Sequence, residues 1–241
     1  MVTRKPTSNG GYEYIATLAG SLAHEIKNPL STIKLNLQLL EEDWADPKTP
    51  KEKRTARKFR VLSQEVQRLT QTLEEFLRFI RVEKLQLDPT DVNEVMAEIA
   101  EFVEPELAHA GIELREQYTQ GLPRCAADAR LLKQAILNVI LNAQQAMSDG
   151  GELILRTSRQ ADTVHVEIID TGPGIPTSAQ DKLFDVFFST KKEGSGLGLA
   201  MARRIVERHG GAVRFHSEPG KGTDFILSIP ACEEPEQGGD P

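Results

Sequence analysis

This sequence has little cysteine, no long apolar run and no excess of basic charge, and each of these shortages excludes a kind of structure or partner. Cys125 and Cys232 are the only cysteines, and they lie far apart without metal-ligand spacing, so a disulfide framework and a zinc site are poorly supported. No stretch approaches the ~20 apolar residues of a membrane helix. The start, MVTRKPTSNGG, also lacks the apolar core of a signal peptide. We therefore expect a soluble chain without membrane insertion, in the reducing cytoplasm.

The charge balance is acidic, which bears on possible partners. Lysine and arginine together number 29 against 36 aspartates and glutamates, a formal net charge of −7. No broad basic face is available to neutralise phosphates, so nucleic acid is excluded as a general partner. With 241 residues, 39% of them hydrophobic, the chain is long enough for a small helical element and one compact domain.

Residues 12–84 are nearly free of glycine and predict two long amphipathic helices, with a break in the turn-prone WADPKTP. Apolar residues on the second helix alternate at spacings of three and four, which is typical of a coiled coil or helical bundle. A single hairpin cannot bury this seam, so we expect a homodimer that pairs two hairpins into a four-helix bundle. The seam consists of Phe59, Leu62, Val66, Leu69, Leu73, Phe76 and Ile80.

Residues 89–231 predict a second domain in which helices and strands are mixed. Helical patterns cover 90–110, 128–147 and 199–209, while strands are expected at 112–118, 152–157 and 164–169 and in a closing hairpin over 212–229. The fold class is therefore α+β: a helical hairpin followed by a two-layer α/β sandwich. Residues 1–11 and 232–241 are expected to be flexible tails.

His24 lies on the first helix, nearly opposite its apolar stripe. A lone histidine in such a place is usually a solvated side chain. Here, however, the run LAHEIKNPL places the Glu25 carboxylate beside it and the Asn28 amide one turn further on, with Pro29 loosening the backbone hydrogen bonding. A carboxylate that accepts the hydrogen of one ring nitrogen orients the other as a nucleophile.

The LAHEIKNPL segment resembles the H-box of HisKA-type sensor histidine kinases. The resemblance implies that His24 accepts a phosphoryl group, that Glu25 assists it, and that Asn28 positions water for dephosphorylating a response regulator. For Asn28, a plain helix-surface amide is an equal alternative.

The helix over 128–147 carries Asn138 and Asn142 on one face of an otherwise apolar sequence. Each could simply bridge a neighbouring loop. With the motifs that follow, the segment resembles the N-box of GHKL, or Bergerat-fold, ATP-binding domains. That resemblance assigns Asn138 to Mg²⁺ and the phosphates, for which a carbonyl oxygen is a suitable hard ligand, and places Asn142 beside the nucleotide.

DTGPGIP follows a predicted strand directly, and its Gly172 and Gly174 allow backbone to approach a ligand closely. An ordinary turn capped by Asp170 would satisfy the same pattern. The segment resembles the G1-box, in which the aspartate accepts a hydrogen bond from the exocyclic amine of adenine. Asp170 is accordingly expected to select adenine.

KLFDVFFSTKKEGSGLGLA places three glycines before a predicted helix, and backbone amides at a helix N-terminus can hold phosphate. The spacing is not GxGxxG, and GKGT further on lacks the hydroxyl residue directly after the lysine, so neither a dinucleotide fingerprint nor a P-loop fits. The segment resembles an F-box joined to a G2-box, with a mobile lid. The residues implied are Lys191, Gly194, Gly196 and Gly198, with Thr223 in a last glycine turn facing the lid.

Five motifs in the family's order make the chain similar to the catalytic core of a two-component sensor histidine kinase, and NAQQAM is typical of the nitrogen-regulation type. The resemblance implies autophosphorylation with Mg-ATP and transfer to a receiver domain of a response regulator. Two departures are Gln145, where many members carry Lys or Arg, and Val186, which replaces a proline. Two alternatives are a GHKL-type ATPase, disfavoured because Gln134 stands where the hydrolysing enzymes carry glutamate, and an ATP-binding scaffold without phosphotransfer.

Overall fold

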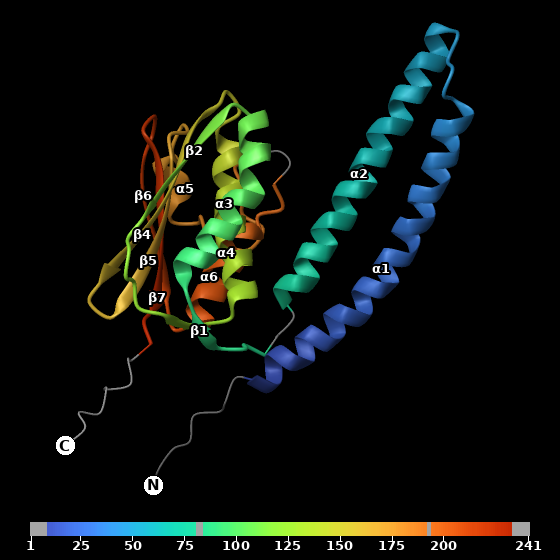
Figure 1. Ribbon diagram of the computed structural model, residues 1–241. Coiled ribbons are helices and arrows are strands. Elements are labelled where there is room, and N and C mark those ends of the chain that lie inside the picture. Colours follow the sequence, from blue (N-terminus) through green and yellow to red (C-terminus); the bar gives the residue numbers. More distant parts are fainter. Residues whose placement is uncertain (1–8, 81–83, 192–193, 233–241) are drawn as a thin grey trace, which may run out of the picture. The chain divides into compact units, whose positions relative to one another are not determined.

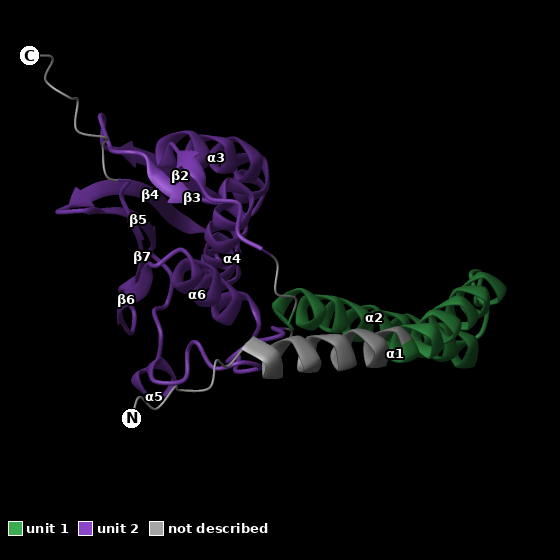
Figure 2. Cartoon of the chain, turned by 90° about the horizontal axis from the view of Figure 1, so that it is seen from below, with its two compact units in different colours: residues 1–83 green, residues 84–241 purple. Residues whose placement is uncertain are grey.

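The computed structural model describes residues 9–80, 84–191 and 194–232, with the side chains of the first helix described from Glu25 onward. The chain divides into two compact units, residues 1–83 and 84–241 (Figure 2). No helix within these described ranges is both long and apolar enough to cross a membrane. The two cysteines are free thiols.

The first unit is a hairpin of two long helices, α1 (Asn9–Asp43) and α2 (Pro50–Ile80). The start of α2 is set by local sequence: Thr49 and Glu52 form a capping box. The Glu52 carboxylate accepts from the amide of Thr49 at 3.1 Å, and the Thr49 hydroxyl accepts from the amide of Glu52 at 3.2 Å. Pro50 lies at the first helical position, where its missing N–H costs nothing. The predicted break between the helices is thus confirmed.

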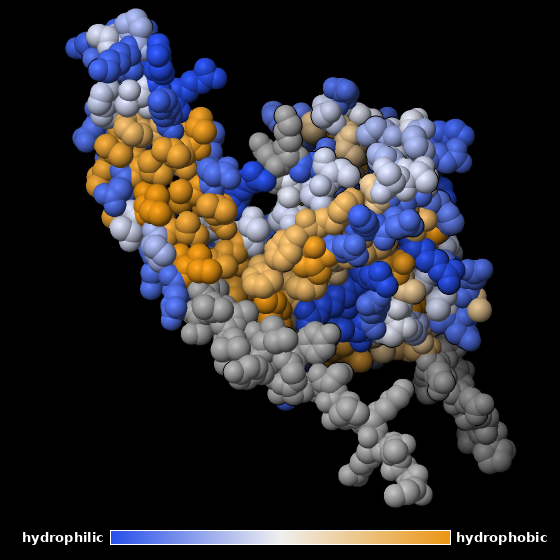
Figure 3. Space-filling model, turned by 180° about the vertical axis from the view of Figure 1, so that it is seen from behind, coloured by the Kyte–Doolittle hydropathy of each residue, from blue (hydrophilic) through white to orange (hydrophobic). Residues whose placement is uncertain are grey.

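Packing within one hairpin buries little of its apolar surface. Of the hydrophobic side chains described there, only Leu37, Ala56 and Val66 are buried, whereas Leu62 and Leu69 of the predicted seam are about half exposed, at 51% and 49%. Figure 3 shows a broad apolar patch on the hairpin. The exposed large hydrophobic residues described in this unit are Ile26, Ile33, Leu35, Leu39, Val61, Leu62 and Leu69.

The second unit is a five-stranded sheet with three helices, α3 (Val92–His109), α4 (Ala129–Ala146) and α6 (Gly198–Arg208), on one face (Figure 1). The strands are β2 (Ile112–Tyr118), β4 (Gly151–Gln160), β5 (Thr163–Asp170), β6 (Ala212–Glu218) and β7 (Gly222–Pro230), in the order β2-β4-β5-β7-β6. Only the β2–β4 pair is parallel. This arrangement confirms the predicted α+β class.

The core lies between that sheet and the helices. Strands β4, β5 and β7 alternate buried and half-buried residues, as expected for a sheet with one covered face. The fully buried side chains of these strands are Leu153, Leu155, Val164, Val166, Ile168, Phe225, Leu227 and Ile229.

Three short elements were not predicted. β1 (Asp88–Thr90) pairs with β3 (Cys125–Ala127) in a two-stranded ribbon, and α5 (Thr177–Gln180) is a single turn. Thr90 closes the ribbon because its hydroxyl donates to the carbonyl of Ala127 at 2.8 Å. Elements of three or four residues carry too little periodicity to be recognised in a sequence.

Candidate functional site

Helix α4 is the platform of the predicted nucleotide site. One face of it is fully buried, and Asn138 and Asn142 lie beside that face, each half-buried. Among the residues that the structure describes, none forms a hydrogen bond with the Asn138 side chain. A half-buried amide without a protein partner is available as an oxygen ligand. The buried face consists of Leu131, Leu132, Ala135, Ile136, Val139, Ile140 and Ala143.

The start of α4 is fixed by His209, a residue that sequence reasoning did not single out. Asp128 caps the helix by accepting from the amide of Leu131 at 3.1 Å. The amide of Asp128 in turn donates to His209 Nε2 at 3.0 Å, so this nitrogen carries no hydrogen and Nδ1–H donates to the carbonyl of Ile205 at 2.8 Å. The buried imidazole therefore ties α4 to the end of α6.

Asp170 ends β5 with its side chain only 4% exposed. Its Oδ1 accepts from the amide of Gly172 at 2.9 Å. Burial raises the pKa of the Asp170 carboxyl above its ordinary value, and hydrogen bonds from the backbone of Gly172 and Thr223, with the positive charge of Lys191, offset part of that rise. A buried acceptor of this kind is suited to a neutral hydrogen-bond donor such as an amine on a flat ring.

Glycine is required in the turn that faces Asp170 across the sheet. Gly222 has a φ of +89°, and a Cβ placed there would overlap the carbonyl oxygen of Asp170. Thr223 pairs with Asp170 in the β5–β7 register and is 5% exposed. Its hydroxyl contacts that of Ser217 at 3.0 Å. Thr223 thus lies beside Asp170 and contacts Ser217, and its expected position facing the lid stays a prediction.

The segment before α6 brings Lys191 to the C-terminal end of α4. Lys191 Nζ donates to the carbonyl of Asn142 at 2.9 Å, to Asn142 Oδ1 at 2.8 Å and to Gln145 Oε1 at 3.3 Å. The carbonyl of Gly196 accepts from the amide of Phe187 at 3.1 Å, and the amide of Gly194 donates to the carbonyl of Lys191 at 3.4 Å. Lys192 and Glu193 lie outside the described residues.

The N-terminus of α6 lies beside Asn138. A Cβ at Gly198 would be 3.9 Å from the Cβ of Asn138. The amides in the first turn of a helix have no acceptor within the helix, and its dipole favours negative charge there. Leu197, which is 2% exposed, anchors this end in the core. The structure therefore places an acceptor for a neutral amine, an ammonium group, two asparagines and a helix N-terminus around the C-terminal half of α4.

The other predicted residues lie in α1. Glu25 and Asn28 are exposed, while the side chain of His24 lies outside the described residues. The helix continues through Pro29, which has no N–H to donate to the carbonyl of Glu25. The hydroxyls of Ser31 and Thr32 donate back to the carbonyls of Lys27 and Asn28, at 2.8 and 3.2 Å.

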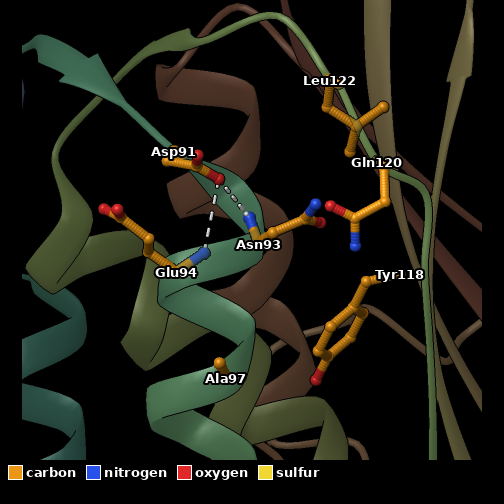
Figure 4. Close-up of a pocket in the computed structure, with 8 residues that line it drawn as sticks. Asp91, Asn93, Glu94, Ala97, Tyr118, Gln120 and Leu122 are labelled. Carbon is orange, nitrogen blue, oxygen red and sulfur yellow. Dashed lines mark hydrogen bonds between the residues drawn. The ribbon is translucent and has the colours of Figure 1, made fainter.

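A hollow of about 350 Å³ lies elsewhere, where α3 begins and β2 ends (Figure 4). Its polar groups serve the fold: Asp91 caps α3 by accepting from the amides of Asn93 and Glu94. The Asn93 side chain donates to the carbonyl of Thr119 and accepts from the hydroxyl of Thr157, both at 2.8 Å. None of the predicted nucleotide residues lines this hollow.

Two family models match this chain, one for each unit. Residues 15–85 match the His Kinase A (phospho-acceptor) domain, and residues 127–233 match the histidine kinase-, DNA gyrase B- and HSP90-like ATPase. The chain belongs to the histidine kinases. Together the two models cover the catalytic core of such a kinase, as the motifs predicted.

Several histidine kinases are similar along most of this chain. Sensor histidine kinase ZraS of Escherichia coli (strain K12) is 34% identical over 213 residues, which are 88% of this chain and 45% of ZraS. Sensory histidine kinase/phosphatase NtrB of Azospirillum brasilense is 33% identical over 242 residues, covering 94% of this chain and 58% of NtrB. The chain therefore spans about half the length of these relatives.

Solved structures of histidine kinases show the same fold. Full-length ShkA in complex with AMPPNP has a TM-score of 0.70 and 27% identity, covering 90% of this chain and 46% of ShkA. Histidine kinase ThkA in complex with response regulator protein TrrA has a TM-score of 0.66 and 26% identity, covering 90% of this chain and 61% of that one.

Proposed function

We propose that this histidine kinase core binds Mg-ATP in its second unit, transfers the γ-phosphoryl group to His24, and passes it to an aspartate of a response regulator receiver domain. The observation that carries the proposal is the grouping of Asp170, Asn142 and Lys191 at one end of α4 and β5. It provides an acceptor for the adenine amine and, separately, one positive group, the Lys191 ammonium, for the phosphates. The AMPPNP complex of ShkA and the TrrA complex of ThkA support the two ligands.

The residues divide the chemistry between them. Asp170 accepts from the adenine amine, with Thr223 beside it. Lys191 and the first amides of α6 bind phosphate oxygens. The amide oxygen of Asn138, which forms no hydrogen bond with any described residue, fits Mg²⁺, which when bound neutralises charge on the phosphates. Gly172, Gly174, Gly194 and Gly196 shape the loops around the nucleotide.

At the acceptor, one ring nitrogen of neutral His24 attacks the γ-phosphorus as the bond to the oxygen of departing ADP breaks. The Glu25 carboxylate accepts the hydrogen of the other ring nitrogen and stabilises the positive charge that develops. Asn28, exposed one turn on, positions water when the regulator is dephosphorylated. Because ATP is a cytoplasmic substrate, we place the chain in the cytoplasm.

We also propose that the kinase is a homodimer through α1 and α2. The half-exposed Leu62 and Leu69 support this, since a four-helix bundle of two hairpins covers such a seam. Hydrolysis of ATP by water is not favoured. Gln134, half-buried on α4 one turn before Asn138, cannot accept a proton from water, and the first unit matches a phospho-acceptor domain.

Incubation with γ-labelled ATP and Mg²⁺ tests the proposal. Wild-type protein should acquire label that is stable in base and labile in acid, as a phosphoramidate is, and His24→Ala should acquire none. His216→Ala is the matched control, because His216 is an exposed histidine in the other unit and should leave labelling unchanged. Label that persists in His24→Ala would refute His24 as the acceptor.

A further inference from the structure

The environment of Lys191 is unusual for a lysine. Its ammonium donates to three acceptors from one turn of α4, namely the carbonyl and Oδ1 of Asn142 and Oε1 of Gln145. All three are uncharged. In the described part of the chain no carboxylate lies within ion-pairing distance of this ammonium, and Asp170 attracts it only from further away. The lysine thus brings a partly buried positive charge that no carboxylate among the described residues pairs with.

The position of this charge depends on the last turn of α4. A cation at the C-terminal end of a helix is stabilised by the helix dipole. Asn142 contributes two of the acceptors, and Gln145 contributes the third from three residues further toward the end of the helix. A lysine side chain has four rotatable bonds, so several acceptors are needed to keep its ammonium in one place.

We propose that Gln145 is a positioning residue for nucleotide binding: it holds the Lys191 ammonium against α4, where that ammonium meets the phosphate oxygens. Gln145 acts through Lys191 and does not itself contact the nucleotide. The inference rests on the proposed function and adds to it a residue with its own role. The inference also explains how the site obtains a cation near the phosphates although residue 145 is uncharged. The cation is Lys191, which comes from the segment before α6.

The neighbouring Gln144 provides a matched control. It lies in the same turn of α4 but points elsewhere, since its Nε2 donates to Glu106 Oε1 of α3 at 3.3 Å. Methionine is similar to glutamine in length and flexibility but offers no comparable acceptor, so Gln145→Met and Gln144→Met make the same chemical change at adjacent positions.

Calorimetric titration with adenosine and with AMP-PNP in a magnesium buffer tests the inference. Gln145→Met should weaken AMP-PNP binding about fivefold, less than the loss of a typical bond to a charged group, because this bond is long at 3.3 Å and both Asn142 acceptors remain. It should leave adenosine binding unchanged, and Gln144→Met should alter neither. In the labelling assay, Gln145→Met should raise KM for ATP by a similar factor with little change in maximal rate. Urea unfolding midpoints establish that each variant is folded.

A double-mutant cycle shows whether Gln145 acts through Lys191. In a Lys191→Met background, Gln145→Met should have no further effect on AMP-PNP affinity. Additive losses would instead show that Gln145 contacts the nucleotide itself, and a Gln145→Met protein that binds AMP-PNP as wild type does would also overturn the inference. Failure of the wild type to bind AMP-PNP at all would contradict the proposed function, so the two outcomes are distinguishable.

Discussion

Replacing Asp170 by asparagine should separate nucleotide binding from folding stability. The two side chains have the same shape, and asparagine keeps one oxygen to accept from the amide of Gly172. It replaces the second oxygen by a donor, which cannot accept from the adenine amine. Loss of a hydrogen bond to a charged group costs about 1.5–3 kcal/mol, so AMP-PNP should bind roughly 10- to 150-fold more weakly.

Stability should respond in the opposite direction. Because burial raises the folded-state pKa of Asp170 above its unfolded value, this group favours the folded state at low pH, and that contribution is lost as pH rises through the folded pKa. Burial therefore disfavours the ionised form of Asp170 in the folded protein. Asp170→Asn removes the charge, so its urea midpoint at pH 7 should equal or exceed that of the wild type.

The assay is calorimetry with AMP-PNP, paired with urea unfolding at pH 7 and with Asp224→Asn as the control. Asp224 also has a carboxyl whose pKa is raised, primarily by burial, yet it is not among the predicted nucleotide residues. That variant should bind AMP-PNP as wild type does. Wild-type affinity in Asp170→Asn would refute the adenine assignment, and a large drop in its urea midpoint would show that lost affinity reflects lost structure.

Three further outcomes are expected. Leu62→Asp with Leu69→Asp should convert the proposed dimer into a monomer, as measured by light scattering. Val61→Asp, which is exposed but outside the seam, should not do so. A dimer in the double variant would contradict the four-helix bundle. Burial lowers the pKa of Lys191 to about 8, so the ammonium loses its proton as pH rises through that value and AMP-PNP affinity should fall. If a Lys191→Met protein shows the same fall in affinity, the fall belongs to another titrating group. Gly220→Ala, which has open space at its positive φ, should cost about 1 kcal/mol of backbone strain. Gly222→Ala should cost about 3 kcal/mol or more, because overlap with Asp170 is added, and equal urea midpoints for the two variants would disprove that account.

Motifs and periodicity carried most of the prediction because both are local properties. The turn after Asp43 is encoded by Thr49, Pro50 and Glu52, whose capping interactions are complete within four residues. The alternation of Val164, Val166 and Ile168 predicted a strand with one buried face, and all three are fully buried. The order of the five sequence motifs likewise predicted the family, and the order of helical and strand patterns predicted the α+β class, without any tertiary contact.

Contacts between segments distant in sequence were decided only by the tertiary structure. His209 accepts from the amide of Asp128 across 81 positions, and Lys191 donates to Asn142 across 49. Nothing near His209 in the sequence marks it as the anchor of α4, because both of its partners are backbone groups, which every residue offers. In the same way Gln145 stood out only as a departure from the family pattern. Its contact with Lys191 is decided by the tertiary structure. A hydrogen bond depends on the positions of atoms, whereas a sequence pattern records only the order of residues.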